Sequence, residues 1–156
     1  MSKSPVSANS IPAPKVKTAY PQPFASLVDG RIKKKLGDHF SLTNFGINLT
    51  SLAPNAVSAL LHHHSKQDEF IYILKGTPTL TLGEKEYIMN PGDCYGFKAG
   101  SGTASQLSNK SEEDVTYLEI GDRTEGDEVN YPNDDIKAIQ LSNGAWVFSH
   151  KDGQPY

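Results

Sequence analysis

The chain has 156 residues, of which 37% are hydrophobic and 21% charged, and its formal net charge is -3. This composition predicts one soluble globular domain and gives no basic excess for binding nucleic acid or an anionic membrane. The first residues lack an apolar signal segment, no run approaches a membrane span, and a single cysteine, Cys94, excludes an internal disulfide. We therefore expect a cytoplasmic protein that does not bind membranes, with Cys94 as a small core residue.

Residues 1–23 are rich in proline and form the first predicted segment. Proline at this density prevents a helix and favours an extended chain similar to polyproline II. The segment is either a disordered tail or an extended arm on the domain or on a partner subunit. Apolar side chains at Ile11, Val16 and Tyr20 would allow the arm to dock.

Residues 24–125 have the pattern of a β-rich domain, in which short apolar segments alternate with turns rich in glycine, proline and asparagine. The predicted strands are 40–52, 57–64, 69–74, 77–82, 85–89, 94–97, 104–108 and 115–120. Many short strands without a long helix indicate an antiparallel, all-β sandwich or barrel. The chain shows no internal repeat, which favours one barrel over a duplicated pair.

Residues 126–156 form a C-terminal extension that we expect to pack on the barrel. The polar run 122–135 predicts a surface loop, and residues 134–139 allow a short helical turn. Residues 144–150 predict a last strand, in which Trp146 anchors the extension rather than stacking on a ligand.

The clearest chemical signal lies in residues 54–76. His62 and His64 are two residues apart, so in a strand both side chains project from one face while His63 points the other way. A turn after His64 lets the next strand return alongside and bring Glu69 within reach of both imidazoles. Two imidazoles and one carboxylate suit a divalent transition metal such as Fe, Mn, Ni or Zn.

This pattern resembles the first sequence motif of the cupin superfamily, and a second motif follows in outline. The matching residues are His62, His64, Glu69 and Gly76 in the first motif, and Gly92, Gly100 and Asn109 in the second. The flanking sequence is similar to small bacterial cupins with one barrel and no defined function. The resemblance implies a double-stranded β-helix, which is a jelly-roll-like barrel, and a homodimer, since family members often dimerise.

The second motif departs from the family pattern at one position that matters for metal binding. Metal-binding cupins place another histidine four residues before the asparagine, and Ser105 stands at that position here. Gln106 is adjacent, but on a strand it should face away from Ser105. The resemblance therefore implies an incomplete site of His62, His64 and Glu69, in which either Ser105 or Gln106 takes the place of the missing imidazole.

A small-molecule pocket is expected at the barrel mouth, because small closed barrels often hold one ligand there. Its candidate lining residues are Ile71, Ile73, Phe97, Ser105, Leu107 and Tyr117. The alternating residues Phe70, Tyr72 and Leu74 should face the other way, toward a second layer or a partner subunit.

Three hypotheses for the function remain open. The first is a metal-dependent enzyme or binder, for which the residues do not choose among oxygenation, isomerisation and lyase chemistry. The second is a metal-free ligand-binding or sensory protein, in which Ser105 marks a lost metal site. A purely structural role is least favoured, because burying a polar cluster is costly unless the cluster has a use.

Overall fold

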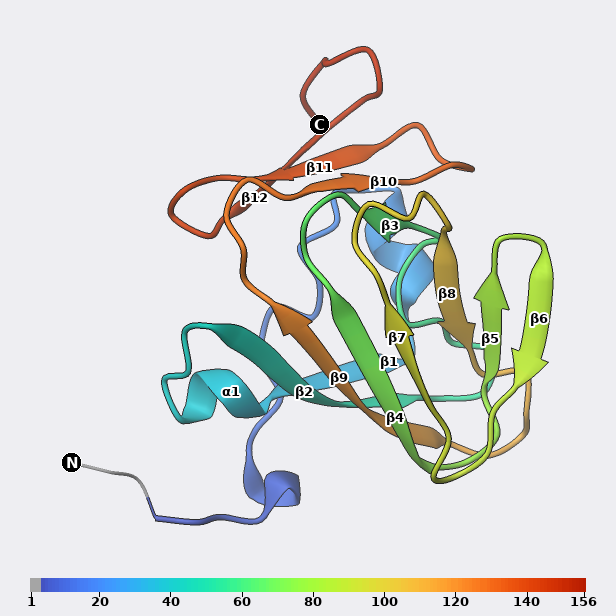
Figure 1. Cartoon of the computed structure of the whole chain (residues 1–156). Helices are drawn as coiled ribbons and strands as arrows, with labels where there is room; N and C mark the ends of the chain where they lie inside the picture. The colour runs from blue at the N-terminus through green and yellow to red at the C-terminus, as the bar shows by residue number, and fades with distance from the viewer. Residues whose placement is uncertain (1–3) are drawn as a thin grey trace.

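The computed structural model describes residues 4–156 and shows an antiparallel β-barrel with a further sheet across one end (Figure 1). Its strands are β1 (Arg31–Lys35), β2 (Phe45–Leu52), β3 (His63–His64), β4 (Glu69–Lys75), β5 (Thr79–Leu82), β6 (Lys85–Ile88), β7 (Cys94–Phe97), β8 (Ser105–Ser108), β9 (Val115–Asp122), β10 (Glu128–Asn130), β11 (Lys137–Gln140) and β12 (Trp146–Ser149). The helices are short: η1 (Ala8–Ser10), η2 (Phe24–Val28) and α1 (Leu36–His39). No helix in the described residues is long and apolar enough to span a membrane.

Three sheets make up the fold. A five-stranded sheet with the order β1-β2-β9-β4-β7 faces a three-stranded sheet with the order β6-β5-β8, and the barrel core lies between them. The third sheet, β12-β11-β10-β3, lies across the end of the barrel that carries β3 (Figure 1). The prediction of an all-β barrel is thereby confirmed.

Strand β4 shows how the sequence pattern directs side chains to the core. Ile71 and Ile73 are 5% and 0% exposed, whereas Phe70, Tyr72 and Leu74 are 37–45% exposed on the outer face. This alternation is the one predicted, and each buried isoleucine contributes about 1.5–3 kcal/mol by removing apolar surface from water. That this outer face forms the interface of a homodimer stays a prediction. The inner residues join a core made of Leu52, Ala56, Ile71, Ile73, Leu80, Met89, Leu107, Val115 and Tyr117.

The glycine after β4 explains one position of the first motif. Gly76 has a φ of +81°, and a Cβ atom there would lie 2.9 Å from the Val115 side chain and 3.0 Å from the Asp114 carbonyl oxygen. Glycine alone tolerates both the left-handed backbone and this close approach. Gly76 therefore sets how β4 turns away from β9 after presenting Glu69 at its other end.

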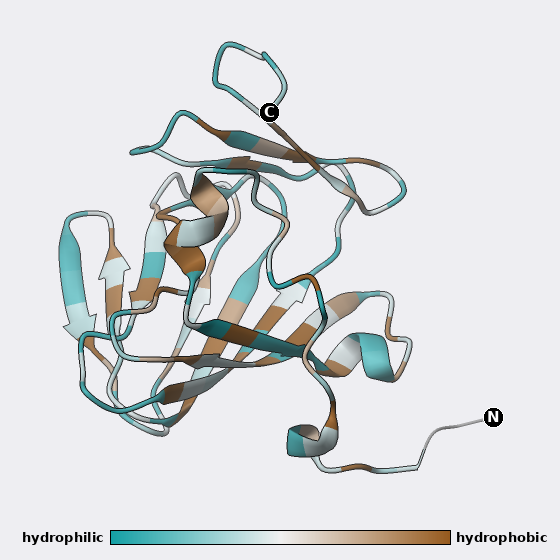
Figure 2. Ribbon diagram, turned by 180° about the vertical axis from the view of Figure 1, so that it is seen from behind, coloured by the Kyte–Doolittle hydropathy of each residue, from teal (hydrophilic) through white to brown (hydrophobic). Residues whose placement is uncertain are grey.

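A second apolar cluster joins the two terminal segments to the barrel. It consists of Phe24, Leu60, Val129, Tyr131, Ile136 and Ala138, with Tyr20, Trp146 and Phe148 packed against it. The N-terminal segment runs along the outside of the barrel to η2, which lies beneath the third sheet (Figure 2). Ile11 is 6% exposed and Tyr20 contacts two aromatic rings of the cluster, so the arm is docked, although Val16 remains 76% exposed.

Two predicted strands near the site are wrong in extent. The strand predicted for 40–52 begins only at Phe45, because the turn signal around Gly37 starts the helix α1 and leaves Phe40 exposed. The strand predicted for 57–64 contains only β3, flanked by isolated bridges at Val57 and His62. The other six predicted barrel strands lie within two residues of their predicted bounds, whereas β1 was not predicted.

The predictions for the polar C-terminal part and for Cys94 are also wrong. The expected surface loop 122–135 contains β10, and the end of the expected helical turn lies in β11. Polar composition alone suggested a loop, but Asp127 and Val129 alternate inward and are 0% and 4% exposed. Cys94 is exposed instead of buried, because it faces outward from β7.

One partly buried ion pair lies on the inner face of the five-stranded sheet. Lys33 Nζ lies 2.7 Å from Glu119 Oε1, and the Thr50 hydroxyl donates to Glu119 Oε2 at 3.2 Å. Burial acts to raise the pKa of Glu119, but the charge and hydrogen bond of Lys33 outweigh it and lower that pKa.

This lowered pKa predicts a pH-dependent contribution to stability. Ionised Glu119 stabilises the fold above the usual glutamate pKa, and the contribution is lost as the pH falls through the lowered value. We expect Glu119→Gln to reduce the free energy of unfolding by about 1–3 kcal/mol at pH 7, with the difference shrinking below about pH 4. Urea denaturation at several pH values measures it, with Glu86→Gln in the exposed Glu86–Lys110 pair as the control. A loss that does not vary with pH would contradict the prediction.

Candidate metal centre

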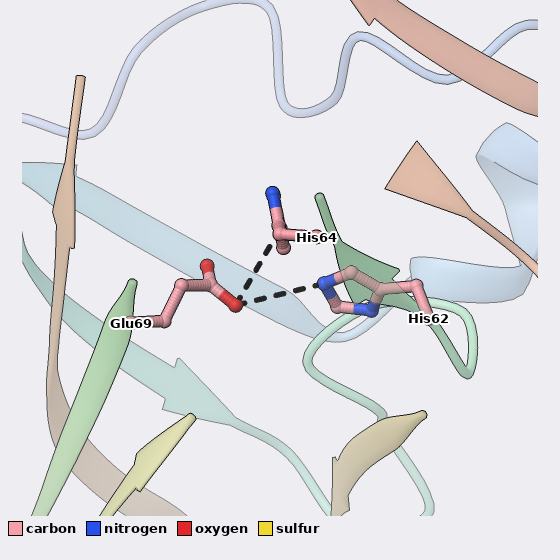
Figure 3. A group of neighbouring side chains, drawn as sticks. All are labelled: His62, His64 and Glu69. Atoms are coloured by element: carbon pink, nitrogen blue, oxygen red, sulfur yellow. Dashed lines mark ion pairs between the residues drawn. The ribbon is translucent and has the colours of Figure 1, made fainter. Parts of the chain in front are cut away.

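Three segments bring the predicted ligands together at the end of the barrel. His62 pairs with Ser105 of β8 through an isolated bridge, His64 lies in β3, and Glu69 is the first residue of β4. Nε2 of His62 and of His64 lie 3.8 Å and 3.5 Å from Oε2 of Glu69. Figure 3 shows both imidazoles turned toward this one carboxylate oxygen.

The spacing of these atoms fits a divalent transition metal. All three ligand atoms lie within 4.8 Å of one another. Two ligand atoms bound at about 2.1 Å to one ion are about 3.0–3.6 Å apart at angles of 90–120°. The nitrogen–oxygen distance of 3.5 Å for His64 lies within this range, and that of 3.8 Å for His62 lies just above it. Small side-chain movements would therefore complete a three-ligand site.

Both imidazoles are also held in the tautomer that a metal requires. Nδ1 of His62 lies 2.7 Å from the carbonyl oxygen of Leu60, and Nδ1 of His64 lies 2.5 Å from Oδ2 of Asp127. Both partners are hydrogen-bond acceptors, so each Nδ1 carries the proton and each Nε2 keeps its lone pair. Outer partners of this kind orient metal-binding histidines and raise their basicity.

The two histidines differ in their electrostatic surroundings. Burial lowers the pKa of His62 and exceeds the opposing effect of the Glu69 charge. Burial also acts to lower the pKa of His64, but the hydrogen bond to Asp127 and the charge of Glu69 outweigh it and raise that pKa. His62 is therefore the more readily available neutral ligand, and Asp127 is the group that sets His64 apart.

Asp127 is the functional residue that the sequence prediction missed. Its carboxylate is fully buried and accepts hydrogen bonds from the backbone N–H groups of Lys66 and Gln67 at 2.7 and 3.3 Å, and from the Ser65 hydroxyl at 3.1 Å. One carboxylate therefore holds both His64 and the turn that leads into Glu69. A signal was present, since Asp127, Val129 and Tyr131 alternate as in a half-buried strand.

Two aromatic side chains of the C-terminal extension cover the cluster. Tyr131 stacks on His62 with ring centroids 5.8 Å apart, and Trp146 approaches His64 edge-on at 6.3 Å. Trp146 packs against the second apolar cluster, which agrees with its expected anchoring role. The extension thus restricts the motion of both imidazoles.

A pocket of about 150 Å³ opens beside the cluster. Its polar side includes Gln67, Thr103 and Ser105, and its apolar side includes Leu82, Tyr95 and Phe97. His63 also lines it.

The predicted pocket residues fall into two groups. Phe97 and Ser105 line the pocket, whereas Ile71, Ile73, Leu107 and Tyr117 lie in the barrel core. Ser105 faces the cluster, and the Gln106 amide instead donates to the Ala59 carbonyl oxygen at 2.7 Å. Of these two residues, Ser105 alone lines the pocket together with His62, His64 and Glu69.

Comparison with known proteins places this geometry in a family. A family model described as a cupin domain matches residues 48–121. The crystal structure of a sugar phosphate isomerase from a cupin superfamily, from Silicibacter pomeroyi, is 35% identical and has a TM-score of 0.90. The match covers 98% of this chain and 96% of that one. The chain belongs to the cupin superfamily. Its fold is accordingly the cupin double-stranded β-helix, as the sequence motifs predicted.

Two further solved cupin-like structures extend the comparison. A candidate sugar phosphate isomerase from Acidithiobacillus ferrooxidans is 33% identical, with a TM-score of 0.71 and coverage of 81% of this chain and 80% of that one. The polyketide cyclase RemF from Streptomyces resistomycificus is 15% identical, covers 77% and 79%, and has a TM-score of 0.62, which shows a shared fold alone. A search among curated proteins found no match.

Proposed function

We propose that this cupin is a divalent-metal-dependent isomerase that acts on a small sugar phosphate. The observation that carries the proposal is the convergence of two Nε2 atoms of fixed tautomer and one carboxylate oxygen beside a pocket. The name of the Silicibacter pomeroyi relative, which matches nearly the full length of this chain, supports the class of substrate and reaction.

The chain's own residues would hold the ion and orient the substrate. His62, His64 and Glu69 supply three ligands and leave further coordination positions open. A bound divalent ion supplies a Lewis acid that polarises a carbonyl or hydroxyl oxygen. The imidazoles are only 13–14% exposed at their side chains, so this chemistry would proceed with little water around the ligands.

The pocket size limits the substrate. At about 150 Å³ it lies below the roughly 300–1,000 Å³ of sites for drug-sized ligands. A ligand of few carbon atoms fits, with any phosphate at the open mouth. Lys98, Ser101 and Thr103 are exposed residues of the pocket lining, although Lys98 also forms an ion pair with Asp68 at 2.9 Å.

The test begins with metal content and continues with activity. We expect protein purified without chelator or a metal-binding tag to contain transition metal by elemental analysis, or to take up about one equivalent on loading. His64→Ala should abolish uptake and His63→Ala should retain it, since His63 lies outside the cluster. The loaded protein should interconvert aldose and ketose phosphates in an NMR assay.

Two outcomes would contradict the proposal in different ways. Less than about a tenth of an equivalent of metal after loading would favour the metal-free ligand-binding hypothesis. Stoichiometric metal without conversion of any four- to six-carbon sugar phosphate would leave a metal-binding cupin with a different reaction.

A further inference from the structure

Two pocket side chains are almost fully buried, yet each keeps an unused hydrogen-bonding atom. Gln67 and Ser105 are both 7% exposed and both line the pocket. Within residues 4–156, the buried side-chain atoms without any partner are Nε of Arg31 and the hydroxyl of Tyr117. Oε1 of Gln67 and the Ser105 hydroxyl also lack a protein partner but are not sealed from solvent. Because both residues line the pocket, these two atoms are available to a ligand bound there.

The orientation of the Gln67 amide follows from its neighbours. Its Nε2 donates to the carbonyl oxygen of Thr124 at 2.9 Å and to Oε1 of Gln140 at 2.7 Å. A backbone carbonyl can only accept, so the nitrogen of the amide must face Thr124. Both of its N–H groups are then used, and Oε1 is left as an acceptor without a donor. A ligand hydroxyl can therefore donate to this oxygen without competing with a protein donor.

Ser105 places its hydroxyl next to the histidine pair. Ser105 and His62 exchange both backbone hydrogen bonds, at 2.8 and 3.2 Å, so they form a directly opposed antiparallel pair. Side chains of such a pair project from the same face, about 5 Å apart. The free hydroxyl thus lies beside the His62 imidazole, while Gln67 lies on the turn that leads into Glu69.

We propose that Gln67 and Ser105 form a hydroxyl-recognition subsite for a polyhydroxylated substrate. Oε1 of Gln67 accepts a hydrogen bond from one substrate hydroxyl, and Ser105 exchanges a hydrogen bond with a neighbouring hydroxyl. The carbon face of the substrate packs on Tyr95 and Phe97 across the pocket. The inference rests on the proposed function for the sugar class of the substrate, but not on the phosphate or the reaction.

This subsite predicts strong rejection of substrates that lack the recognised hydroxyl. A site built to hydrogen-bond a hydroxyl discriminates against its deoxy analogue more strongly than an apolar pocket discriminates by shape, because the protein group is left unpaired. The probes are D-ribose 5-phosphate with its 2-deoxy and 3-deoxy analogues, and free D-ribose with its matching deoxy sugars. Calorimetry on the metal-loaded and the chelator-treated protein measures each affinity.

The wild-type protein should bind at least one parent sugar about ten-fold or more tightly than one of its deoxy analogues. Gln67→Met, which keeps the side-chain length but has no amide acceptor, should reduce that ratio to about two-fold or less. Gln67→Lys serves if Gln67→Met does not fold, because an amine can still donate to Thr124 and cannot accept. Ser105→Ala should reduce the ratio of affinities between the parent sugar and the deoxy analogue that lacks the neighbouring hydroxyl.

The matched control is Ser108→Ala on the same strand. Ser108 is also buried, but its hydroxyl donates to the Thr79 carbonyl oxygen at 3.3 Å and lies outside the pocket lining. This variant should keep the wild-type ratio. A wild-type ratio near one, or an unchanged ratio in the Gln67 and Ser105 variants, would overturn the subsite.

Comparison of the two sugar series separates this inference from the proposed function. If the protein discriminates among free sugars and the phosphate adds no affinity, the proposed subsite is supported and the proposed phosphorylated substrate is contradicted. If the sugar phosphates bind tightly but their deoxy analogues bind equally well, the phosphorylated substrate is supported and the subsite is contradicted. Failure of every sugar to bind would overturn both.

Discussion

Replacing Asp127 with asparagine should weaken metal binding by about 10–100-fold and lower the free energy of unfolding by about 2–4 kcal/mol. The buried carboxylate accepts from His64 Nδ1 and from three other donors. In asparagine one oxygen becomes an NH₂ group, which cannot accept from any of them. The other three donors share Oδ1 and His64 alone contacts Oδ2, so the NH₂ group would face His64. The NH₂ group and the Nδ1–H group then lack an acceptor, and His64 loses the partner that keeps its proton on Nδ1.

Two measurements separate the effect on His64 from a general loss of stability. Chelator competition gives the metal affinity, and ¹⁵N NMR of the folded protein reports which nitrogen of His64 carries the proton. Asp122→Asn is the control, because Asp122 also accepts from two backbone N–H groups, at Asp68 and Thr124, and does not contact His64. If Asp127→Asn leaves both the affinity and the His64 tautomer unchanged, Asp127 serves folding alone.

The three candidate metal ligands could be predicted from the sequence because they lie within eight consecutive residues. His62 and His64 are two positions apart and Glu69 follows after one turn, so strand periodicity predicted that both imidazoles project toward one side and that Glu69 returns beside them. Gly76 is local in the same sense, since its left-handed backbone reflects the end of one strand. The alternation in β4 was equally predictable, because its inner residues fill a core that any sheet packing would require.

The support for the ligands could not be predicted in this way because it comes from distant segments. Asp127 lies 63 residues after His64, and the Gln67 amide is oriented by Thr124 and Gln140, which are 57 and 73 residues away. Such partners depend on how the C-terminal extension crosses the barrel end, and composition favoured a solvated loop there. Polar residues that alternate inward look the same in sequence as polar residues of a loop unless their burial is known.

The strands were recovered where turns were marked and misjudged where backbone geometry is irregular. Glycine and proline delimit β5 to β8 well. Residues 57–62, in contrast, are apolar enough for a strand but follow the barrel corner with isolated bridges at Val57 and His62. The irregular path shapes the candidate site, because it lets His62 pair with Ser105 while His64 pairs with Val129 of β10.

Replacing Ser105 with histidine should raise transition-metal affinity by on the order of 100-fold, because it adds a fourth protein ligand to the cluster. Ser105 and His62 are opposed across an antiparallel bridge with their side chains on the same face. An imidazole at position 105 would therefore project beside that of His62, into space that now belongs to the pocket. The same substitution should weaken sugar binding, since it removes the Ser105 hydroxyl and fills the subsite.

Gln106→His provides the matched control for this gain. Position 106 is adjacent in sequence, but its side chain is directed to the Ala59 carbonyl oxygen and away from the cluster. Competition with a chelator of known affinity, using Zn²⁺ and Co²⁺, should show tighter binding in Ser105→His alone, and thermal denaturation with and without metal should show a larger stabilisation. Equal affinities in the two variants would mean that position 105 does not face the ion. A gain in affinity together with unchanged sugar binding would place the ligand elsewhere in the pocket. We expect metal affinity to rise and sugar affinity to fall, because the small Ser105 side chain now leaves room both for a further metal ligand and for a substrate hydroxyl.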